Sequence, residues 1–166
     1  MKLNEALSQI LILPYIGNKP SSERSAKHFE NEVTNILRNV GEVIERPHGA
    51  NQSPACTINN MPVIIRTSKG NKIMWNENLP DRNGLLILNL KFGTVVVHGS
   101  LIISEDNYNI LVEAKKETSK ILKERFNTNG NFKVAGGRIQ FKDTIDWENM
   151  RIQLFRETIE RIEKCY

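Results

Sequence analysis

The sequence contains few of the residues that hold transition metals or form disulfides. Among its 166 residues there are two cysteines, Cys56 and Cys165, and three histidines. The cysteines are far apart in the chain, and no histidine stands at ligand spacing from a cysteine or from another histidine. The pattern argues against a zinc finger and a Cys-x-x-Cys redox motif, and it is typical of a reduced intracellular protein.

Long hydrophobic runs are also missing. The apolar run from Ile10 to Leu13 is stopped by Pro14, and no other segment approaches the roughly 20 apolar residues that cross a bilayer. We therefore expect no membrane association and a cytoplasmic location. The glycines form no phosphate-binding loop, and no serine, histidine and acid are arranged as a catalytic triad. Neither a P-loop nucleotidase nor a serine hydrolase is indicated.

The remaining composition is that of an ordinary globular protein. Hydrophobic residues make up 39% of the chain and charged residues 25%. The length suits a single domain over residues 1–166, with a core over about 22–126 and a C-terminal hairpin and helix over 130–164. The formal net charge is +4. This modest basic excess fits a polyanionic partner such as nucleic acid.

Apolar residues at helical spacing predict four helices. The clearest begins at Ser21 or Ser22, which serves as the N-cap, and closes at Gly41. Ser104 is the expected N-cap of the next helix. The acidic residues that follow it support this start, because negative charge in the first turn stabilises a helix. Arginines of the last helix alternate with glutamates, which is typical of a solvated face. The first three helices are expected over 3–13, 22–40 and 105–126. The fourth is expected to start at Asp143 or Asp146 and to end near Glu163.

Short apolar and β-branched runs predict strands between these helices. A possible strand at 42–46 precedes a hairpin that reverses at Asn59-Asn60, and the runs 85–88 and 94–97 suit strands buried on both faces. A Gly136-Gly137 turn predicts a second hairpin, in which 132–134 pairs with 138–141. The order of helix, sheet, helix, hairpin and helix predicts an α/β core with a β appendage.

Three segments together resemble type II restriction endonucleases of the PD-(D/E)xK superfamily. The first is Phe29-Glu30-Asn31-Glu32-Val33 on the second helix, and the next is Gly49-Ala50-Asn51-Gln52-Ser53-Pro54 before a strand. The most specific is Thr67-Ser68-Lys69-Gly70-Asn71-Lys72-Ile73-Met74-Trp75-Asn76, which follows the next strand. The resemblance covers roughly residues 22 to 105. It implies a restriction-endonuclease-like core, with a central mixed sheet flanked by helices and with the C-terminal hairpin and helix added to it.

The resemblance also implies a function. Such enzymes recognise double-stranded DNA as homodimers and hydrolyse a phosphodiester with Mg²⁺, which carboxylates of a Pro-Asp and a Glu-x-Lys motif hold. Here the catalytic positions read Ala55, Ile64 and Arg66, and only the helix glutamate, Glu30, is retained. Alanine and isoleucine bind no hard cation. We therefore expect DNA recognition, with cleavage impaired or lost.

Two alternatives remain open from the sequence. The chain could be an active endonuclease with a displaced centre, because Asp106, Glu113 and Lys115 mimic the catalytic spacing. It could also be an inactive nuclease-like subunit that serves as a DNA-binding or interaction partner. Asp81 with Lys91 imitates the spacing as well, although Asp81 is better interpreted as a turn residue.

Polar residues near the resembling segments are the expected DNA contacts. Amide side chains read adenine edges, arginine reads guanine, and lysine contacts phosphate. The expected DNA-binding residues are Asn51, Gln52, Ser68, Lys69, Asn71, Lys72, Trp75, Arg138 and Gln140.

Overall fold

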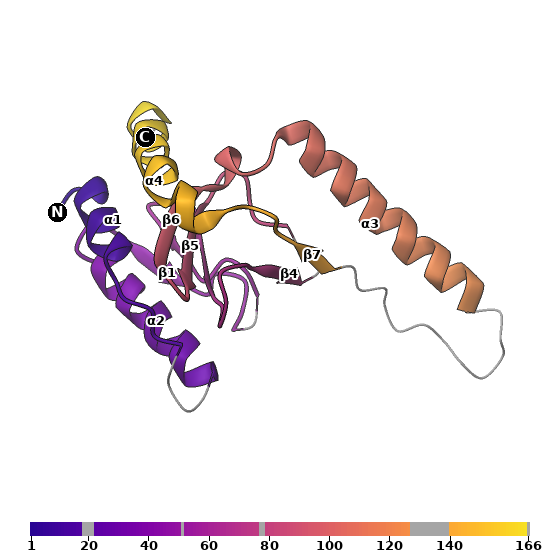
Figure 1. Ribbon diagram of the computed structural model, residues 1–166, viewed down its shortest axis with the longest axis horizontal. Coiled ribbons are helices and arrows are strands. Elements are labelled where there is room, and N and C mark those ends of the chain that lie inside the picture. The colour runs from indigo at the N-terminus through magenta and orange to yellow at the C-terminus, as the bar shows by residue number, and fades with distance from the viewer. Residues whose placement is uncertain (18–21, 51, 77–78, 127–139, 166) are drawn as a thin grey trace.

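The computed structural model describes residues 1–17, 22–50, 52–76, 79–126 and 140–165. Within these ranges the protein has an α/β fold, with a five-stranded mixed sheet, a two-stranded sheet and four α-helices (Figure 1). The helices are α1 (Leu3–Leu11), α2 (Ser22–Leu37), α3 (Glu105–Phe126) and α4 (Trp147–Cys165). The strands are β1 (Val43–Glu45), β2 (Cys56–Ile58), β3 (Met61–Thr67), β4 (Met74–Asn76), β5 (Leu85–Leu90), β6 (Gly93–His98) and β7 (Gln140–Lys142).

The larger sheet has the strand order β1-β2-β3-β5-β6. All neighbours are antiparallel except β3 and β5, which run parallel. The turn between β2 and β3 places Asn59 and Asn60 at φ 48° and 67°. A two-residue turn with positive φ at both positions matches the twist of the strands it joins, and asparagine tolerates that conformation well. The hairpin predicted at Asn59-Asn60 is therefore confirmed.

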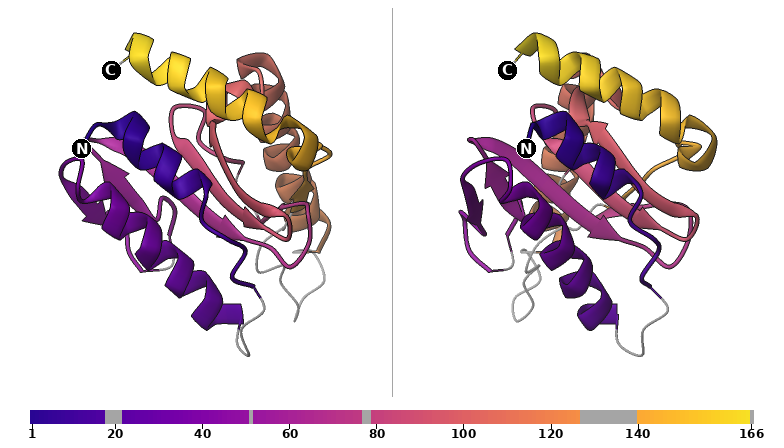
Figure 2. Two further views of the ribbon diagram at one scale, coloured as in Figure 1. Left: turned by 60° about the vertical axis from the view of Figure 1, so that its left-hand side comes forward. Right: turned by 90° about the vertical axis from the view of Figure 1, so that its left-hand side faces the viewer.

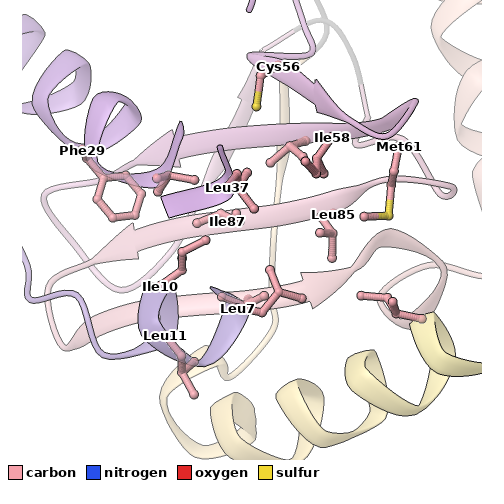
Figure 3. Packing of buried hydrophobic residues seen from close by; sticks show 14 residues of the cluster. Leu7, Ile10, Leu11, Phe29, Leu37, Cys56, Ile58, Met61, Leu85 and Ile87 are labelled. Carbon is pink, nitrogen blue, oxygen red and sulfur yellow. The ribbon is translucent and has the colours of Figure 1, made fainter. Parts of the chain in front are cut away.

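One face of this sheet is covered by α1 and α2 (Figure 2). Side chains alternate along a strand, so Val63 of β3, Leu85 and Ile87 of β5 and Val96 of β6 reach the same layer. Leu85 and Ile87 pack against helix residues such as Phe29 (Figure 3). The side chains of Phe29 and of these four strand residues are all at most 1% exposed. Every residue of β5 and β6 is buried. The sequence prediction of two strands buried on both faces is confirmed.

The opposite face carries a second hydrophobic cluster. Leu86, Leu88 and Val97 pack there with Trp75 of β4 and Trp147 of α4. Strand β4 pairs antiparallel with β7, and the sequence did not predict β4. Of the predicted hairpin only its last residues are described: Gln140 and Lys142 of β7 are exposed. The segment 127–139, which includes the predicted partner strand and turn, lies outside the described residues.

Two helix ends differ in detail from the expectation, and the start of α4 is decided between its two candidates. Helix α2 stops at Leu37 rather than near Val40, because the chain tightens there into a turn in which the Val40 amide donates to the Leu37 carbonyl. Of the two candidates for the start of α4, Asp146 is the cap, since its carboxylate accepts from the Asn149 amide at 3.2 Å. Helix α1 ends at Leu11, before Ile12 and Leu13.

The solvated arginine face predicted for α4 is wrong at Arg151. Its guanidinium is half-buried and donates to the backbone carbonyls of Leu11 and Thr94. It therefore joins α4 to the end of α1 and to β6.

Helix α3 extends away from the main sheet (Figure 1). It begins where predicted, with the Ser104 hydroxyl accepting from the Asn107 amide. The expected apolar stripe is only partly covered: Leu111 and Leu122 are half-buried, whereas Ile121 is exposed. No helix in the described ranges combines the length and apolar content that crossing a bilayer requires.

Candidate functional site

The antiparallel strands β1, β2 and β3 bring three chain segments into one row. The register pairs Glu45 with Cys56 and Cys56 with Val63. One residue further out, the Arg46 amide donates to the Ala55 carbonyl at 2.9 Å, and the Ala55 amide donates to the Val63 carbonyl at 3.0 Å. Arg46 and Ala55 therefore stand next to each other at the end of their strands, close to Ile64 on β3.

This row lines a small pocket of about 100 Å³. Ile64 and Arg66 are two residues apart on β3 and so point to the same side of the sheet. The lining residues are Arg46, Gln52, Ser53, Ala55, Ile64, Ile65 and Arg66. The three positions that the sequence aligned with the catalytic aspartate, glutamate and lysine thus meet at one place.

The residues present do not fit a magnesium ion. Ala55 and Ile64 are each 4% exposed and offer only hydrocarbon to the pocket. Mg²⁺ requires oxygen ligands, usually with one or two carboxylates. No group of three or more histidine, cysteine, aspartate or glutamate side chains in the described part of the chain is arranged to hold a metal. We therefore assign no metal-dependent step to this pocket.

Glu30, the one retained carboxylate, is bound by an arginine. Its Oε2 lies 2.6 Å from Arg46 Nη2, and its side chain is 9% exposed. Its Oε1 has no hydrogen-bond partner among the described residues, and its ion-pair partner is Lys27 Nζ at 3.5 Å. Arg46 Nη1 also donates to the Gln52 carbonyl at 3.3 Å. Glu30 therefore fixes Arg46 at the pocket.

Sequence reasoning missed Arg46 and Ser53. A signal for Arg46 was present, because it stands at the end of the expected strand 42–46 and would lie beside Ala55 once that strand is paired. The pairing register was the missing information. Arg46 also has a φ of 48°, a left-handed conformation uncommon for a non-glycine residue, which no local sequence pattern indicates.

Arg66 has a different environment from Arg46. It is half-buried, and among the described residues its guanidinium donates no side-chain hydrogen bond and forms no ion pair. Burial lowers the pKa of Arg66 from its ordinary value, and the like charge of Arg46 lowers it further. Arginine stays protonated in proteins, so the shift marks a cation that the native fold does not neutralise.

The alternative centre on α3 is not assembled. Asp106 and Glu113 are exposed on a single helix, and seven residues of helix separate them by roughly 10 Å along its axis. Glu113 instead faces Lys116 at 3.5 Å, with both side chains 70% exposed. Lys115 lies on the same helix and is half-buried. The described residues of α3 therefore do not form a displaced active site.

The seven expected DNA contacts that the structure describes fall into three groups. Lys69, Asn71, Gln52 and Gln140 are exposed. Ser68 and Lys72 are engaged within the protein: the Ser68 hydroxyl donates to the Lys72 carbonyl at 2.8 Å, and Lys72 Nζ donates to the Ile145 carbonyl at 2.7 Å. Trp75 is 4% exposed and packs in the second cluster. Its observed role is packing. Asn51 and Arg138 lie outside the described residues.

Comparison of the chain with models of protein families, with curated proteins and with solved structures gives no match.

Proposed function

We propose that this chain is a DNA-binding protein with a restriction-endonuclease-like core, which holds duplex DNA as a homodimer and does not cleave it with Mg²⁺. One observation carries the proposal. Ala55, Ile64 and Arg66, chosen from sequence as the counterparts of a nuclease active site, line one pocket together. The hairpin of β2 and β3 places Ala55 beside Ile64, and Arg66 follows on the same side of β3. The same pocket also takes in Gln52, an expected DNA contact, and Arg46, which follows β1.

The charge of this pocket supports a polyanionic ligand. The residues that line it include two arginines and no carboxylate, and Glu30 is ion-paired with one of these arginines, Arg46. Lys69, exposed, follows Arg66 by three residues, so its Cα lies at most about 11 Å from that of Arg66. The chain as a whole carries a net charge of +4. A basic pocket beside an exposed lysine suits successive phosphates of a DNA backbone.

The composition of the pocket argues against hydrolysis. Without carboxylates there is no metal to activate water or to neutralise charge on the phosphate, and losing even one such stabiliser typically costs about 10²–10³ in rate. In this proposal the protein therefore retains DNA binding but not DNA cleavage. The homodimer belongs to it because a palindromic site is matched by a two-fold symmetric protein.

Fluorescence anisotropy with a labelled duplex tests DNA binding. Affinity should fall steeply between about 50 and 200 mM salt, because each neutralised phosphate adds roughly 0.9 to the slope of log affinity against log salt. Lys69→Ala should reduce this slope by about one unit. Lys164→Ala, which removes an equal charge from the last turn of α4, is the control and should leave the slope unchanged. Affinity that is weak and insensitive to salt contradicts the proposal.

Incubation of plasmid with Mg²⁺ or Mn²⁺ tests the absence of cleavage. The unmodified chain should give at most trace cutting, and efficient site-specific cutting would overturn the proposal. A variant with Ala55→Asp, Ile64→Glu and Arg66→Lys restores the ligands of the family motif. Metal-dependent cutting by this variant alone would support descent from a nuclease.

A further inference from the structure

We infer that the pocket formed by Arg46 and Arg66 binds one phosphodiester group directly, through its guanidinium groups and without a metal ion. The inference rests on the proposed function, because the phosphodiester is taken to belong to duplex DNA. It adds which chemical group enters the pocket and which atoms hold it.

Arg66 supplies the unused donors. A guanidinium carries five N–H donors in a planar fork that matches two oxygens of a phosphate. Among the described residues none of these donors is engaged by a protein acceptor. Half-buried guanidinium groups normally find an acceptor, because an unpaired charge away from water is costly. A phosphate oxygen in the pocket would provide that acceptor.

Arg46 supplies a positioned second cation. Glu30 and the Gln52 carbonyl hold its guanidinium at 2.6 Å and 3.3 Å, which uses part of its fork and fixes its orientation. Donors that are already ordered lose little entropy when a ligand arrives. Its remaining N–H groups are the ones available to the pocket, which it lines together with Arg66.

The size and walls of the pocket favour a single anionic group over a base. Its volume of about 100 Å³ is well below the roughly 300–1,000 Å³ of sites that enclose small organic ligands. Ala55 and Ile64 form apolar walls that offer nothing to a base edge or to a cation. An apolar wall also lowers the local dielectric, which strengthens the attraction between a guanidinium and a phosphate.

Electrostatics supports the same ligand. The pKa of Arg66 is lowered by burial and by the charge of Arg46, so the native fold brings together two like charges, of which Arg46 is ion-paired with Glu30. An anion placed between the arginines would counter both effects. A divalent metal ion would worsen them. We therefore expect the duplex to bind in EDTA, and Mg²⁺ to leave the affinity unchanged or to lower it by competing for the DNA phosphates.

Two measurements on the full chain test the inference. The first is titration of ¹⁵N-labelled protein with dimethyl phosphate, followed by NMR of the backbone amides and the arginine Nε–Hε groups. The signals of Arg66 and of the Ser53 and Ala55 amides should shift, and Arg66→Met should abolish these shifts. The second is duplex affinity by anisotropy, which Arg66→Met should lower about tenfold, the effect of losing one charge-assisted contact.

Two further variants serve as controls. Arg66→Lys keeps the charge but loses the planar fork, so its affinity should lie between those of the unmodified chain and Arg66→Met. Arg38→Met removes an equal charge from a surface arginine that pairs with Glu45 at 3.0 Å, and it should change affinity less than about twofold. Dispersed NMR spectra of all variants would confirm that each is folded.

The outcomes separate the two proposals. If the duplex binds but Arg66→Met behaves like Arg38→Met and dimethyl phosphate shifts no pocket signal, the inference is overturned and DNA binding stands. If dimethyl phosphate shifts the pocket signals but the duplex does not bind, the phosphodiester pocket stands and DNA is not its source. Affinity that requires Mg²⁺ would also overturn the inference.

Discussion

Replacing Arg66 with methionine should stabilise the free protein while it weakens DNA binding. The guanidinium is half-buried, donates to no described protein acceptor, and lies near the like charge of Arg46. Replacing buried charges with apolar side chains of similar volume is often neutral or stabilising by about 1–4 kcal/mol. Because Arg66 is partly screened by solvent, we take the lower end, about 1 kcal/mol. For a chain of this length that corresponds to a rise of roughly 2–4 °C in Tm.

Thermal unfolding by circular dichroism, in a buffer free of phosphate and sulfate, measures this effect. Arg38→Met is the matched control. Its exposed ion pair with Glu45 is worth about 0–1 kcal/mol, so its Tm should stay the same or fall. A fall in Tm of several degrees for Arg66→Met would mean that the guanidinium has a stabilising native partner. That result would remove the physical basis of the anion pocket.

Three further predictions concern other parts of the fold. Burial, and then the charge of Glu30, raise the pKa of Cys56 to about 12. At pH 8 a thiol reagent should therefore label the exposed Cys165 quickly and the buried Cys56 only after unfolding. Burial first, and then Arg161, lower the pKa of His98, whose Nδ1 accepts from the Ser100 amide. The unfolded chain therefore binds that proton more readily, and the free energy of unfolding should fall as pH drops below about 6.5, less so in His98→Asn. The Asp143 carboxylate accepts from the Ile73 amide at 2.7 Å and from Trp147 Nε1 at 2.8 Å. Asp143→Ala leaves both buried donors without an acceptor and should lower the free energy of unfolding, measured by chemical denaturation, by about 3 kcal/mol. A loss under about 1 kcal/mol would contradict these hydrogen bonds.

Sequence patterns predicted the elements whose cause is local. The Asn59-Asn60 turn follows from the tolerance of asparagine for positive φ, and the burial of β5 and β6 follows from unbroken apolar runs. The start of α3 follows from the Ser104 cap and the acidic first turn. Each signal is contained within a few residues, so no knowledge of distant contacts was needed.

The features that the sequence did not predict depend on contacts between residues far apart in the chain. Strand β4 is three residues long and exists through pairing with β7, which lies over sixty residues later in the chain. Charge alternation predicted a solvated Arg151, but its acceptors belong to Leu11 and Thr94, on other elements. Trp75 was expected at a DNA surface because it belongs to the segment after the second strand that resembles the DNA-contacting part of restriction endonucleases. Strand β4 instead pairs with β7, and Trp75 is buried in the second cluster. Such contacts depend on tertiary structure that a local pattern does not contain.

The pocket lies where the sequence placed the counterpart of a nuclease active site, but its charge is opposite to that of a metal-binding site. A metal-dependent nuclease uses carboxylates, so its site is acidic until a cation binds and can then attract a phosphate. Here Arg66 and Arg46 make the site cationic without any ligand, and Glu30 serves to orient one of them. In the proposed function such a site holds a phosphate through its arginines, because it offers no carboxylates to fix a metal that would polarise the phosphate or generate a nucleophile. The residues that stand where the family has its metal ligands would then anchor the DNA backbone, and the Arg66→Met affinity measurement tests this role.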